Sequence, residues 1–388
     1  MRKVALPLLM GTARLSGAPG GLAALLVAIA LAGACGPGST TAHSPAPVTG
    51  SSSPSAGSSA TPSTNPSANP SPAPVTGAYG ILVSSQASTN YTVSLVGIDG
   101  RVIASAQAST PAAVNCANAA AAIVPLPVST SNTRVYYMDA QGVVRFLAPN
   151  GDAGKATTVP IGTARRSMFA VSPDDQRIAV IVDDFTSSGA STRLYAEDLN
   201  GGGNHLDLFS QTGAFTLWPT GWHGTNNLVL AKVPACTQGG GFGCCGPQEL
   251  HVVDPATAVR RFTIGGSTCI ISGPAAPAGA SCETTTGTAN VYSWTAALLR
   301  TYPIPGVGMG PIYLSPNGQH LALSSNPNET TVEGYNNLTM IACGWIDDTH
   351  LIAGGDAQNQ PRIGEVTTGK ILPVAAQGDC GGRIPGGL

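Results

Sequence analysis

The chain has 388 residues, a formal net charge of −2 and only 10% charged residues. This near-neutral balance excludes a basic nucleic-acid-binding surface as the main theme, so we expect no nucleic-acid partner. The 49 glycines and 31 prolines are many for a helical protein and normal for a turn-rich β protein.

The first 34 residues have the composition of a secretory signal. Arg2, Lys3 and Arg14 supply positive charge, and Gly21–Ala34 is an uninterrupted apolar stretch of 14 residues. That stretch is short for the roughly 30 Å of bilayer hydrocarbon, but it suits the apolar region of a signal peptide. We therefore expect a signal segment at 1–34.

Cys35 directly follows the small residues Ala32, Gly33 and Ala34. This arrangement resembles the bacterial lipobox, in which the cysteine thiol receives a diacylglycerol and becomes the new N-terminus. The family prefers Leu three places before the cysteine, where this chain has Ala32 and carries Leu31 one place earlier. The resemblance implies lipidation of Cys35 and an extracytoplasmic protein anchored to the bacterial cell membrane. A plain signal peptide cleaved near Ala34 and a short spanning anchor are the alternatives.

Residues 35–78 after this cysteine are almost wholly Ser, Thr, Pro, Ala and Gly. Such a segment has no apolar set to bury and cannot offset the entropy of ordering. We expect a disordered tether at 35–78, which its prolines would extend.

The remaining residues, 79–388, repeat a strand, a tight turn and a second strand. The clearest copies are FAVSPDDQRIAVIVDD at 169–184 and IYLSPNGQHLALSSN at 312–326, and each turn has Pro and Asp or Asn in positions that favour it. Weaker copies lie at 126–139, 219–233 and 342–355. A second hairpin pattern is present at 91–106, 192–209, 249–264 and 361–374.

Two hairpins make a four-stranded unit that recurs at about 43 to 49 residues, which is the period of β-propeller blades. The turns fall near residues 86, 129, 172, 221, 268, 315 and 344. We therefore predict an all-β, seven-bladed propeller with a short sixth blade, and six blades is the alternative. A β-sandwich would not need this recurrence.

The segments SPDDQRIAV (172–180) and SPNGQHLAL (315–323) resemble the repeat of TolB-type and WD40-like bacterial propellers, whose pattern is Ser-Pro-Asp-Gly followed by an alternating strand. The chain departs from it at Asp175, where the family has Gly, and at Gly221–Trp222 and Gly344–Trp345, which replace Ser-Pro. The resemblance implies a propeller architecture over residues 79–388.

Eight cysteines besides Cys35 fit an exported, disulfide-bonded chain. We predict that Cys269 pairs with Cys282, that Cys343 pairs with Cys380, and that Cys236 pairs with Cys244 or Cys245. Cys116 has no assigned partner. Metal binding is the rival interpretation, but the sequence has no CxxC and no zinc-finger histidine spacing.

No catalytic or cofactor motif is present, and we expect no cofactor, no metal and no catalytic residue. The glycine cluster at 239–246 lacks the Lys-Ser/Thr partner and the helix of a phosphate loop. We interpret the histidines of the repeat region as turn residues and not as a ring of metal ligands. We interpret the acidic pairs as turn or strand-end residues. We interpret Trp222 and Trp345 as residues that pack between blades and not as a surface on which a sugar stacks. These histidines are His205, His223, His251, His320 and His350, whereas the sixth, His43, lies in the tether; the acidic pairs are Asp174–Asp175, Asp183–Asp184 and Asp347–Asp348.

These observations favour a lipid-anchored propeller that acts as a protein- or ligand-binding scaffold at the cell envelope, with an envelope protein or polymer as partner. The Cys- and Gly-rich insertion at 236–246 is the loop we expect to matter most for that partner. The alternative is a secreted propeller enzyme, a hydrolase or lyase acting on glycan or peptide from the central funnel. Fold alone does not choose between them.

Overall fold

The computed structural model describes residues 75–388, apart from 117–121, 123, 188, 237–246, 248, 305–310 and 327. The expected signal segment 1–34, Cys35 and all but the last four residues of the tether 35–78 lie outside the described residues. Cys244 and Cys245 also lie outside them. Within the described residues, no helix is long and apolar enough to cross a bilayer.

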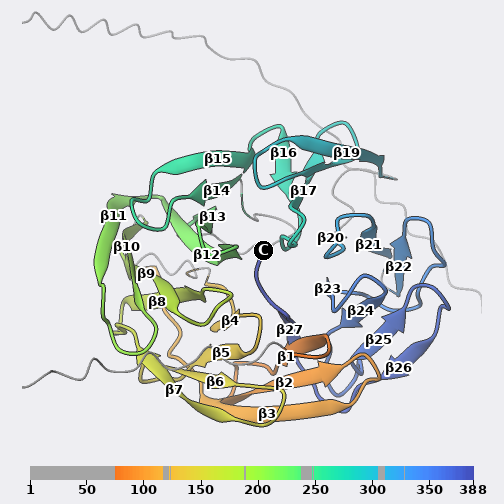
Figure 1. Ribbon diagram of the computed structural model, residues 1–388, viewed down its shortest axis with the longest axis horizontal. Coiled ribbons are helices and arrows are strands. Elements are labelled where there is room, and N and C mark those ends of the chain that lie inside the picture. Colours follow the sequence, from red (N-terminus) through yellow and green to blue (C-terminus); the bar gives the residue numbers. More distant parts are fainter. Residues whose placement is uncertain are drawn as a thin grey trace, which may run out of the picture. The chain divides into compact units, whose positions relative to one another are not determined.

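The strands form seven antiparallel sheets arranged as blades around a central axis (Figure 1). The first blade contains β1 (Tyr79–Val83), β2 (Asn90–Gly97), β3 (Val102–Ser109) and β27 (Asp379–Ile384); the second contains β4 (Val128–Thr130), β5 (Val135–Met138), β6 (Val143–Leu147) and β7 (Ala153–Thr158). The third contains β8 (Arg165–Val171), β9 (Arg177–Phe185), β10 (Ala190–Asp198) and β11 (Leu206–Gly213); the fourth contains β12 (Phe215–His223), β13 (Asn227–Pro234), β14 (Glu249–Val253) and β15 (Arg260–Gly265).

The remaining blades follow in chain order. The fifth contains β16 (Cys269–Ile271), β17 (Ala280–Thr284), β18 (Thr288–Tyr292) and β19 (Leu298–Pro303); the sixth contains β20 (Ile312–Leu314), β21 (Leu321–Asn326) and β22 (Glu329–Val332); the seventh contains β23 (Gly344–Trp345), β24 (His350–Ala353), β25 (Arg362–Glu365) and β26 (Ile371–Pro373). The all-β, seven-bladed prediction is confirmed, its short sixth blade has three strands, and the six-blade alternative is excluded.

The ring is closed by strands from both ends of the propeller. β27 pairs antiparallel with β1, from Tyr79 opposite Ile384 to Val83 opposite Asp379, so the first blade has the order β27-β1-β2-β3. The last strand of the sequence therefore supplies the innermost strand of the first blade. Opening the ring requires loss of this pairing, which joins residues about 300 positions apart.

The two Ser-Pro turns share one hydrogen-bond pattern. The hydroxyl of Ser172 donates to Asp174 (2.6 Å) and accepts from the Arg177 amide (2.9 Å). Ser315 does the same with Asn317 (2.8 Å) and the His320 amide (3.0 Å). The repeated sequence thus encodes a repeated turn at the end of β8 and of β20.

Asp175 departs from the repeat pattern without breaking the turn. It has a φ of 60°, in the left-handed region where Gly318 of the other turn has 73°. Asp enters this region more readily than most residues. Its carboxylate accepts hydrogen bonds from the hydroxyls of Tyr136 (2.7 Å) and Thr133 in the second blade. The carboxylate thereby links two blades where the usual glycine would not.

Trp222 and Trp345 are packing residues, as predicted. Both are buried, and their indole N–H groups donate to the Ala170 carbonyl (3.0 Å) and the Tyr313 carbonyl (2.9 Å). Each acceptor lies on the first strand of the preceding blade. The Gly-Trp pairs that replace Ser-Pro therefore join neighbouring blades.

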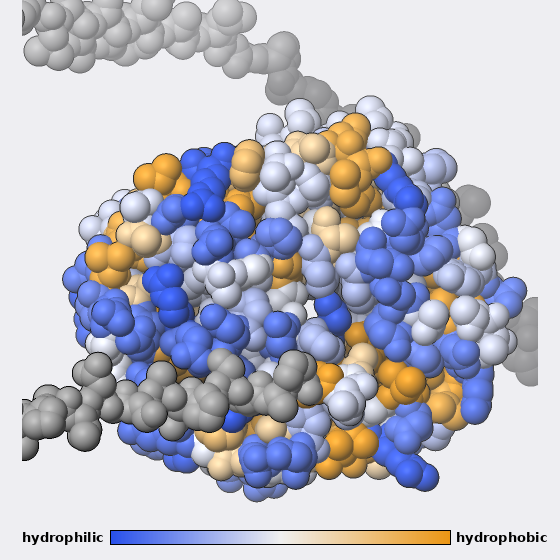
Figure 2. Space-filling view, in the orientation of Figure 1, coloured by the Kyte–Doolittle hydropathy of each residue, from blue (hydrophilic) through white to orange (hydrophobic). Residues whose placement is uncertain are grey.

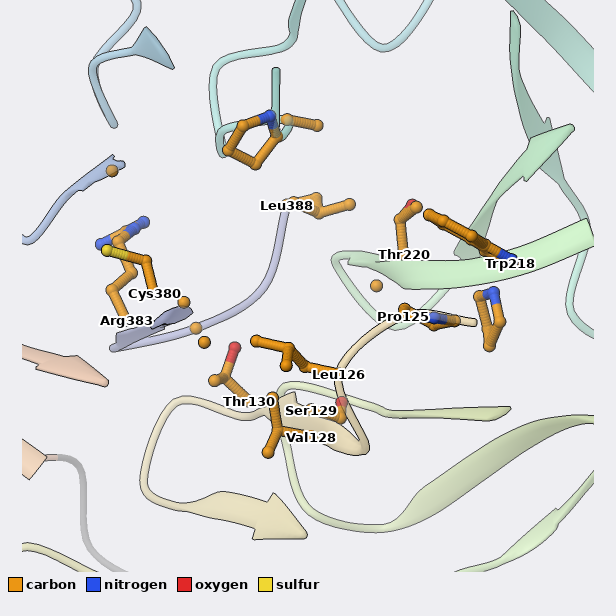
Figure 3. Close-up of a pocket in the computed structure, with 18 of the residues that line it drawn as sticks. Pro125, Leu126, Val128, Ser129, Thr130, Trp218, Thr220, Cys380, Arg383 and Leu388 are labelled. Atoms are coloured by element: carbon orange, nitrogen blue, oxygen red, sulfur yellow. The ribbon is translucent and has the colours of Figure 1, made fainter. Parts of the chain in front are cut away.

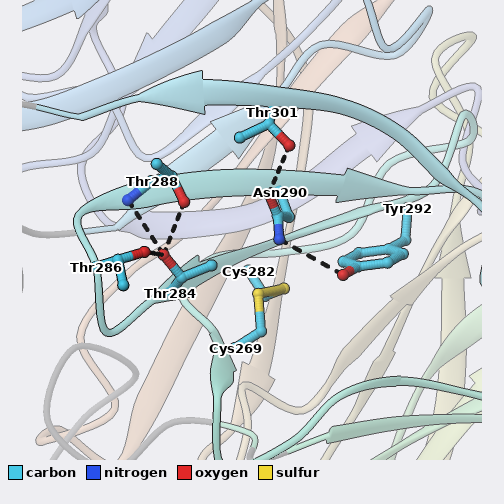
Figure 4. Close-up of a disulfide and its surroundings, with 8 residues drawn as sticks. All are labelled: Cys269, Cys282, Thr284, Thr286, Thr288, Asn290, Tyr292 and Thr301. Carbon is cyan, nitrogen blue, oxygen red and sulfur yellow. Dashed lines mark hydrogen bonds between the residues drawn. A yellow bond between two sulfur atoms is a disulfide. The ribbon is translucent and has the colours of Figure 1, made fainter.

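The fifth blade holds the Cys269–Cys282 disulfide, which confirms that predicted pair (Figure 4). The bond connects β16 to β17, with the two Cα atoms 5.2 Å apart. Beside it, the Thr284 hydroxyl accepts from the Thr288 amide (3.2 Å), and Thr301 donates to Asn290 (2.8 Å). Polar contacts and a covalent bond thus support a blade whose first strand has only three residues.

Candidate functional site: the axial channel

A cavity of about 550 Å³ lies on the propeller axis, between the innermost strands (Figure 3). Every blade contributes to its wall. One lining residue from each innermost strand, in blade order, is Gly381, Val128, Met168, Trp218, Ile271, Leu314 and Trp345. The wall is mainly apolar, and the volume falls within the range typical of small-molecule sites.

Residues 110–116 and 124–127 border one end of this axial channel. A disulfide between Cys116 and Cys236, with Cα atoms 6.0 Å apart, fixes residues 110–116 beside the end of β13. Ala122 forms a β-bridge with Cys236, and the guanidinium of Arg166 donates to the Ala112 carbonyl (3.3 Å). The chain then brings Pro125 and Leu126 into the channel wall (Figure 3).

Residues 385–388 cross the opposite end of the channel. The Gly386 amide donates to the Ser131 carbonyl and the Leu388 amide to the Trp222 carbonyl, both at 2.7 Å. Trp222 lies at the end of β12, whereas the disulfide-bonded segment lies beside its beginning. The nine residues of β12 span roughly 27 Å at about 3.3 Å each, so the two segments border opposite mouths.

Gly386 allows this close passage of the chain. A Cβ atom at Gly386 would lie 2.3 Å from the Thr130 hydroxyl oxygen. Its neighbour Gly387 has a φ of 83°, which L side chains rarely adopt. The glycine pair is thus required by the path of the chain along the channel wall.

Arg166 and Arg383 are the charged residues among the described residues that line the channel. Burial lowers the pKa of both guanidinium groups, and the negative charges of Asp348 and Asp347 partly oppose that shift at Arg383. The guanidinium of Arg166 donates to the Ala112 carbonyl, whereas that of Arg383 forms no hydrogen bond or ion pair with the described side chains or carbonyls. Among the described lining residues, the Arg383 guanidinium is therefore the cationic group available to bind an anion.

The cysteine predictions have a mixed outcome. Cys343 pairs with Cys380 as predicted, with Cα atoms 5.9 Å apart. The predicted pairing of Cys236 with Cys244 or Cys245 is wrong, because Cys236 pairs with Cys116. Cys116 lies beside the end of β13, so a cysteine 120 positions away reaches bonding distance, and proximity in the sequence was misleading.

The five histidines of the propeller do not form a ring. His205 contacts Glu197 (2.7 Å), His251 contacts Glu249 (2.9 Å) and His350 contacts Asp347 (2.9 Å). His320 stacks at a tilt on Tyr335, and His223 stacks on Trp294 and bonds to the Leu388 carbonyl oxygen. Across the described part of the chain, no group of three or more His, Cys, Asp or Glu residues is arranged to hold a metal ion.

Each acidic pair is divided between two structural roles. Asp183 is fully buried and accepts hydrogen bonds from the Thr192 (2.6 Å) and Thr216 (2.5 Å) hydroxyls, whereas Asp184 faces outward and pairs with Arg165 (2.7 Å). Successive strand residues point to opposite faces, which explains this division. Burial raises the pKa of Asp183 to about 6, although the two threonine hydrogen bonds oppose the shift.

The other two acidic pairs lie in turns. Asp174 and Asp175 bond to Ser172 and Tyr136 as described above, whereas Asp347 bonds to His350 and Asp348 accepts from the Asn317 amide (2.8 Å). These carboxylates are structural, as predicted, and do not line the channel.

The surface of the propeller away from the axis carries both apolar and hydrophilic residues. In Figure 2, apolar residues lie in separate patches, mostly toward the rim, with hydrophilic residues between them. Exposed apolar side chains occur on the outer strands β3, β11, β15 and β19: Val102, Ile103, Leu206, Phe209, Phe262, Leu298 and Leu299. The axial channel is thus the more defined candidate site.

Comparisons with known proteins found no sequence match and solved structures of low similarity. No family model matches the chain, and no curated protein sequence matches it. An oligogalacturonate lyase in complex with manganese is 9% identical, covering 77% of this chain and 90% of its own, with a TM-score of 0.46. The C-terminal WD40 domain of Sif2 is 12% identical (67% and 74% covered, TM-score 0.39), and Saccharomyces cerevisiae Sqt1 is 12% identical (76% and 85% covered, TM-score 0.42). At these TM-scores the similarities do not indicate a ligand or an activity for this protein.

Sequence reasoning missed the residues that define the channel. Arg383 lies in the run CGGRIPGG, where a single charge between glycines and an apolar residue matches no binding motif. Pro125 belongs to a connecting segment with no repeat pattern, and Leu126 begins the weaker copy at 126–139, which gives no sign of a channel. Only the folded ring brings them together, although the isolated arginine among glycines was a signal that could have drawn attention.

Proposed function

We propose that this protein is a lipid-anchored, extracytoplasmic propeller that binds a ligand of the cell envelope in its axial channel. The observation that carries the proposal is the cavity of about 550 Å³, which all seven blades line with mainly apolar residues and which contains the unpaired Arg383. An apolar cavity with few, oriented polar groups is the usual form of a small-molecule site.

The three disulfides support the extracytoplasmic part of the proposal. Cys116–Cys236, Cys269–Cys282 and Cys343–Cys380 are of a kind that persists in oxidising compartments. Lipidation of Cys35, the signal segment 1–34, the tether 35–78 and kinship with TolB-type lipoproteins rest on the sequence patterns. A tethered propeller would also meet an envelope protein or polymer, with the insertion at 236–246 as the contact loop.

Replacing Cys35 tests the anchor. Cys35→Ser removes the thiol that would carry the diacylglycerol, so the chain should leave the membrane fraction of the bacterium and lose its lipid mass. The measurement is cell fractionation combined with mass spectrometry of the intact chain. Membrane retention of an uncleaved Cys35→Ser chain would replace the lipid anchor with a spanning segment.

Filling the channel tests the binding function. Thr220 projects into the channel from β12, and Thr220→Trp should block it. After incubation with an envelope extract, mass spectrometry should find small molecules bound to the parent chain and none on Thr220→Trp. The matched control is Thr212→Trp, which makes the same change at an exposed position of the outer strand β11.

Two outcomes would overturn the proposal. One is an identical set of bound compounds on the parent chain and on Thr220→Trp. The other is turnover of a glycan or peptide by the purified chain that Thr220→Trp abolishes, which would establish the enzyme alternative instead.

A further inference from the structure

Arg383 and the apolar residues Pro125, Leu126 and Trp218 lie on different sides of the axial channel (Figure 3). Arg383 lies with Cys380 on β27. Disulfides hold the chain near both sides: Cys343–Cys380 holds β27, and Cys116–Cys236 holds residues 110–116 beside the end of β13. A ligand in this channel therefore meets two different chemistries along its length.

The two arginines of the channel are not equivalent. Arg166 is buried and donates to the Ala112 carbonyl, so its guanidinium already has a partner. The guanidinium of Arg383 has no hydrogen-bond or ion-pair partner among the described side chains or carbonyls, although it lies in the wall of an apolar cavity. Arg383 is partly buried, and an oxyanion at that position would accept hydrogen bonds from its guanidinium.

The carboxylates nearest to Arg383 are already engaged. Asp347 binds His350 at 2.9 Å, and Asp348 accepts from the Asn317 amide at 2.8 Å. Neither lines the channel, and none of the described lining residues is acidic. An incoming anion would therefore meet the guanidinium without an acidic side chain of the described wall beside it.

We propose that the channel binds an elongated amphiphile whose single anionic group, a carboxylate or a phosphate monoester, pairs with Arg383 while its hydrocarbon part lies against Leu126 and Trp218. The guanidinium matches both oxyanions with two parallel N–H donors, and the apolar wall takes the chain. This inference rests on the proposed function and names its ligand class.

The test uses three probes that share one chain and differ in the head group: decanoate, decyl phosphate and decan-1-ol, each below its micelle concentration. Calorimetric titration of the full chain carrying Cys35→Ser should show decanoate or decyl phosphate binding about tenfold or more tightly than the alcohol. Preference for the carboxylate indicates a fatty-acid-like ligand, and preference for the phosphate indicates a lipid-phosphate-like ligand.

Two variants assign the preference to one side chain. Arg383→Met keeps much of the volume and removes the charge, so the anionic probes should bind no better than decan-1-ol. Unchanged decan-1-ol binding would show that the channel is intact in this variant. Arg101→Met is the matched control, because Arg101 is exposed and pairs with Asp99 in a surface turn; it should keep the full preference.

Decan-1-ol binding as tightly as both anionic probes, or a preference that survives Arg383→Met, would overturn the inference. Its failure is distinguishable from failure of the proposed function. If the envelope compounds found on the parent chain are absent from Thr220→Trp but no probe binds the parent chain, only the ligand class is wrong. If Thr220→Trp carries the same bound compounds as the parent chain, the channel is not the binding site.

Discussion

At the scale of single residues, the buried carboxylate of Asp183 is the group whose protonation should most affect stability. It accepts from Thr192 on the adjacent strand β10 and from Thr216 on β12 of the next blade, so it joins the third and fourth blades. Two hydroxyl donors do not fully replace the water that a carboxylate loses on burial. Asp183 therefore loses hydration on burial and gains hydrogen bonds that join two blades.

We predict that Asp183 makes the protein less stable as the pH rises from about 4 to about 6. The pKa of Asp183 is about 6 in the folded chain, against the ordinary value of 3.8 that applies to the unfolded chain. The folded state therefore binds the proton more tightly. The stabilisation is complete below about pH 4 and is lost as the pH passes the folded pKa; a shift of this size corresponds to roughly 3 kcal/mol in the free energy of unfolding. Asp183→Asn stays neutral and can still bond both threonines, so urea unfolding should find it more stable than the parent above pH 6.

The control for this prediction is Asp184→Asn. Asp184 is half exposed and pairs with Arg165, so its removal should change stability by less than about 1 kcal/mol and leave the pH dependence in place. Parallel pH–stability curves for the parent and Asp183→Asn would show that Asp183 does not carry this dependence.

At the scale of elements, the sequence predicts what is local and misses what is not. The hairpins at 91–106, 192–209, 249–264 and 361–374 are present as β2–β3, β10–β11, β14–β15 and β25–β26, because alternation and turn residues act over a few positions. The Ser-Pro turns and the Gly-Trp packing positions could be placed for the same reason. The short sixth blade could be predicted from the spacing between turns.

Elements that depend on distant partners could not be placed from the sequence. The pairing of β27 with β1, the bond of Cys116 to Cys236 and the position of Arg383 in the channel each join residues at least 120 positions apart or require the closed ring. Such contacts follow from the number of blades and the direction of closure. No pattern in the segments 110–127 or 379–388 encodes them locally.

At the scale of the whole molecule, closure of the ring depends on β27, and one disulfide holds that strand to the seventh blade. Cys380 lies on β27 and Cys343 directly precedes β23, so their bond joins the last blade to the strand that completes the first. Cys343 also accepts a hydrogen bond from the Gly354 amide at 3.0 Å. Loss of this disulfide should therefore weaken the closure itself as well as the seventh blade.

We predict that the double variant Cys343→Ser, Cys380→Ser lowers the free energy of unfolding by about 3 to 4 kcal/mol, from the chain entropy of a 37-residue separation. The matched control, Cys269→Ser with Cys282→Ser, removes a bond within one blade and should cost a similar amount, about 3 kcal/mol, for its separation of 13 residues. Amide hydrogen exchange separates the two cases. In the first variant the amides of β27 and β1 should exchange faster than those of the other blades, because the closing strand detaches before the rest unfolds. In the control those amides should keep their protection, with faster exchange confined to β16 and β17. Equal protection of β27 and β1 in both variants would mean that backbone pairing alone closes the ring.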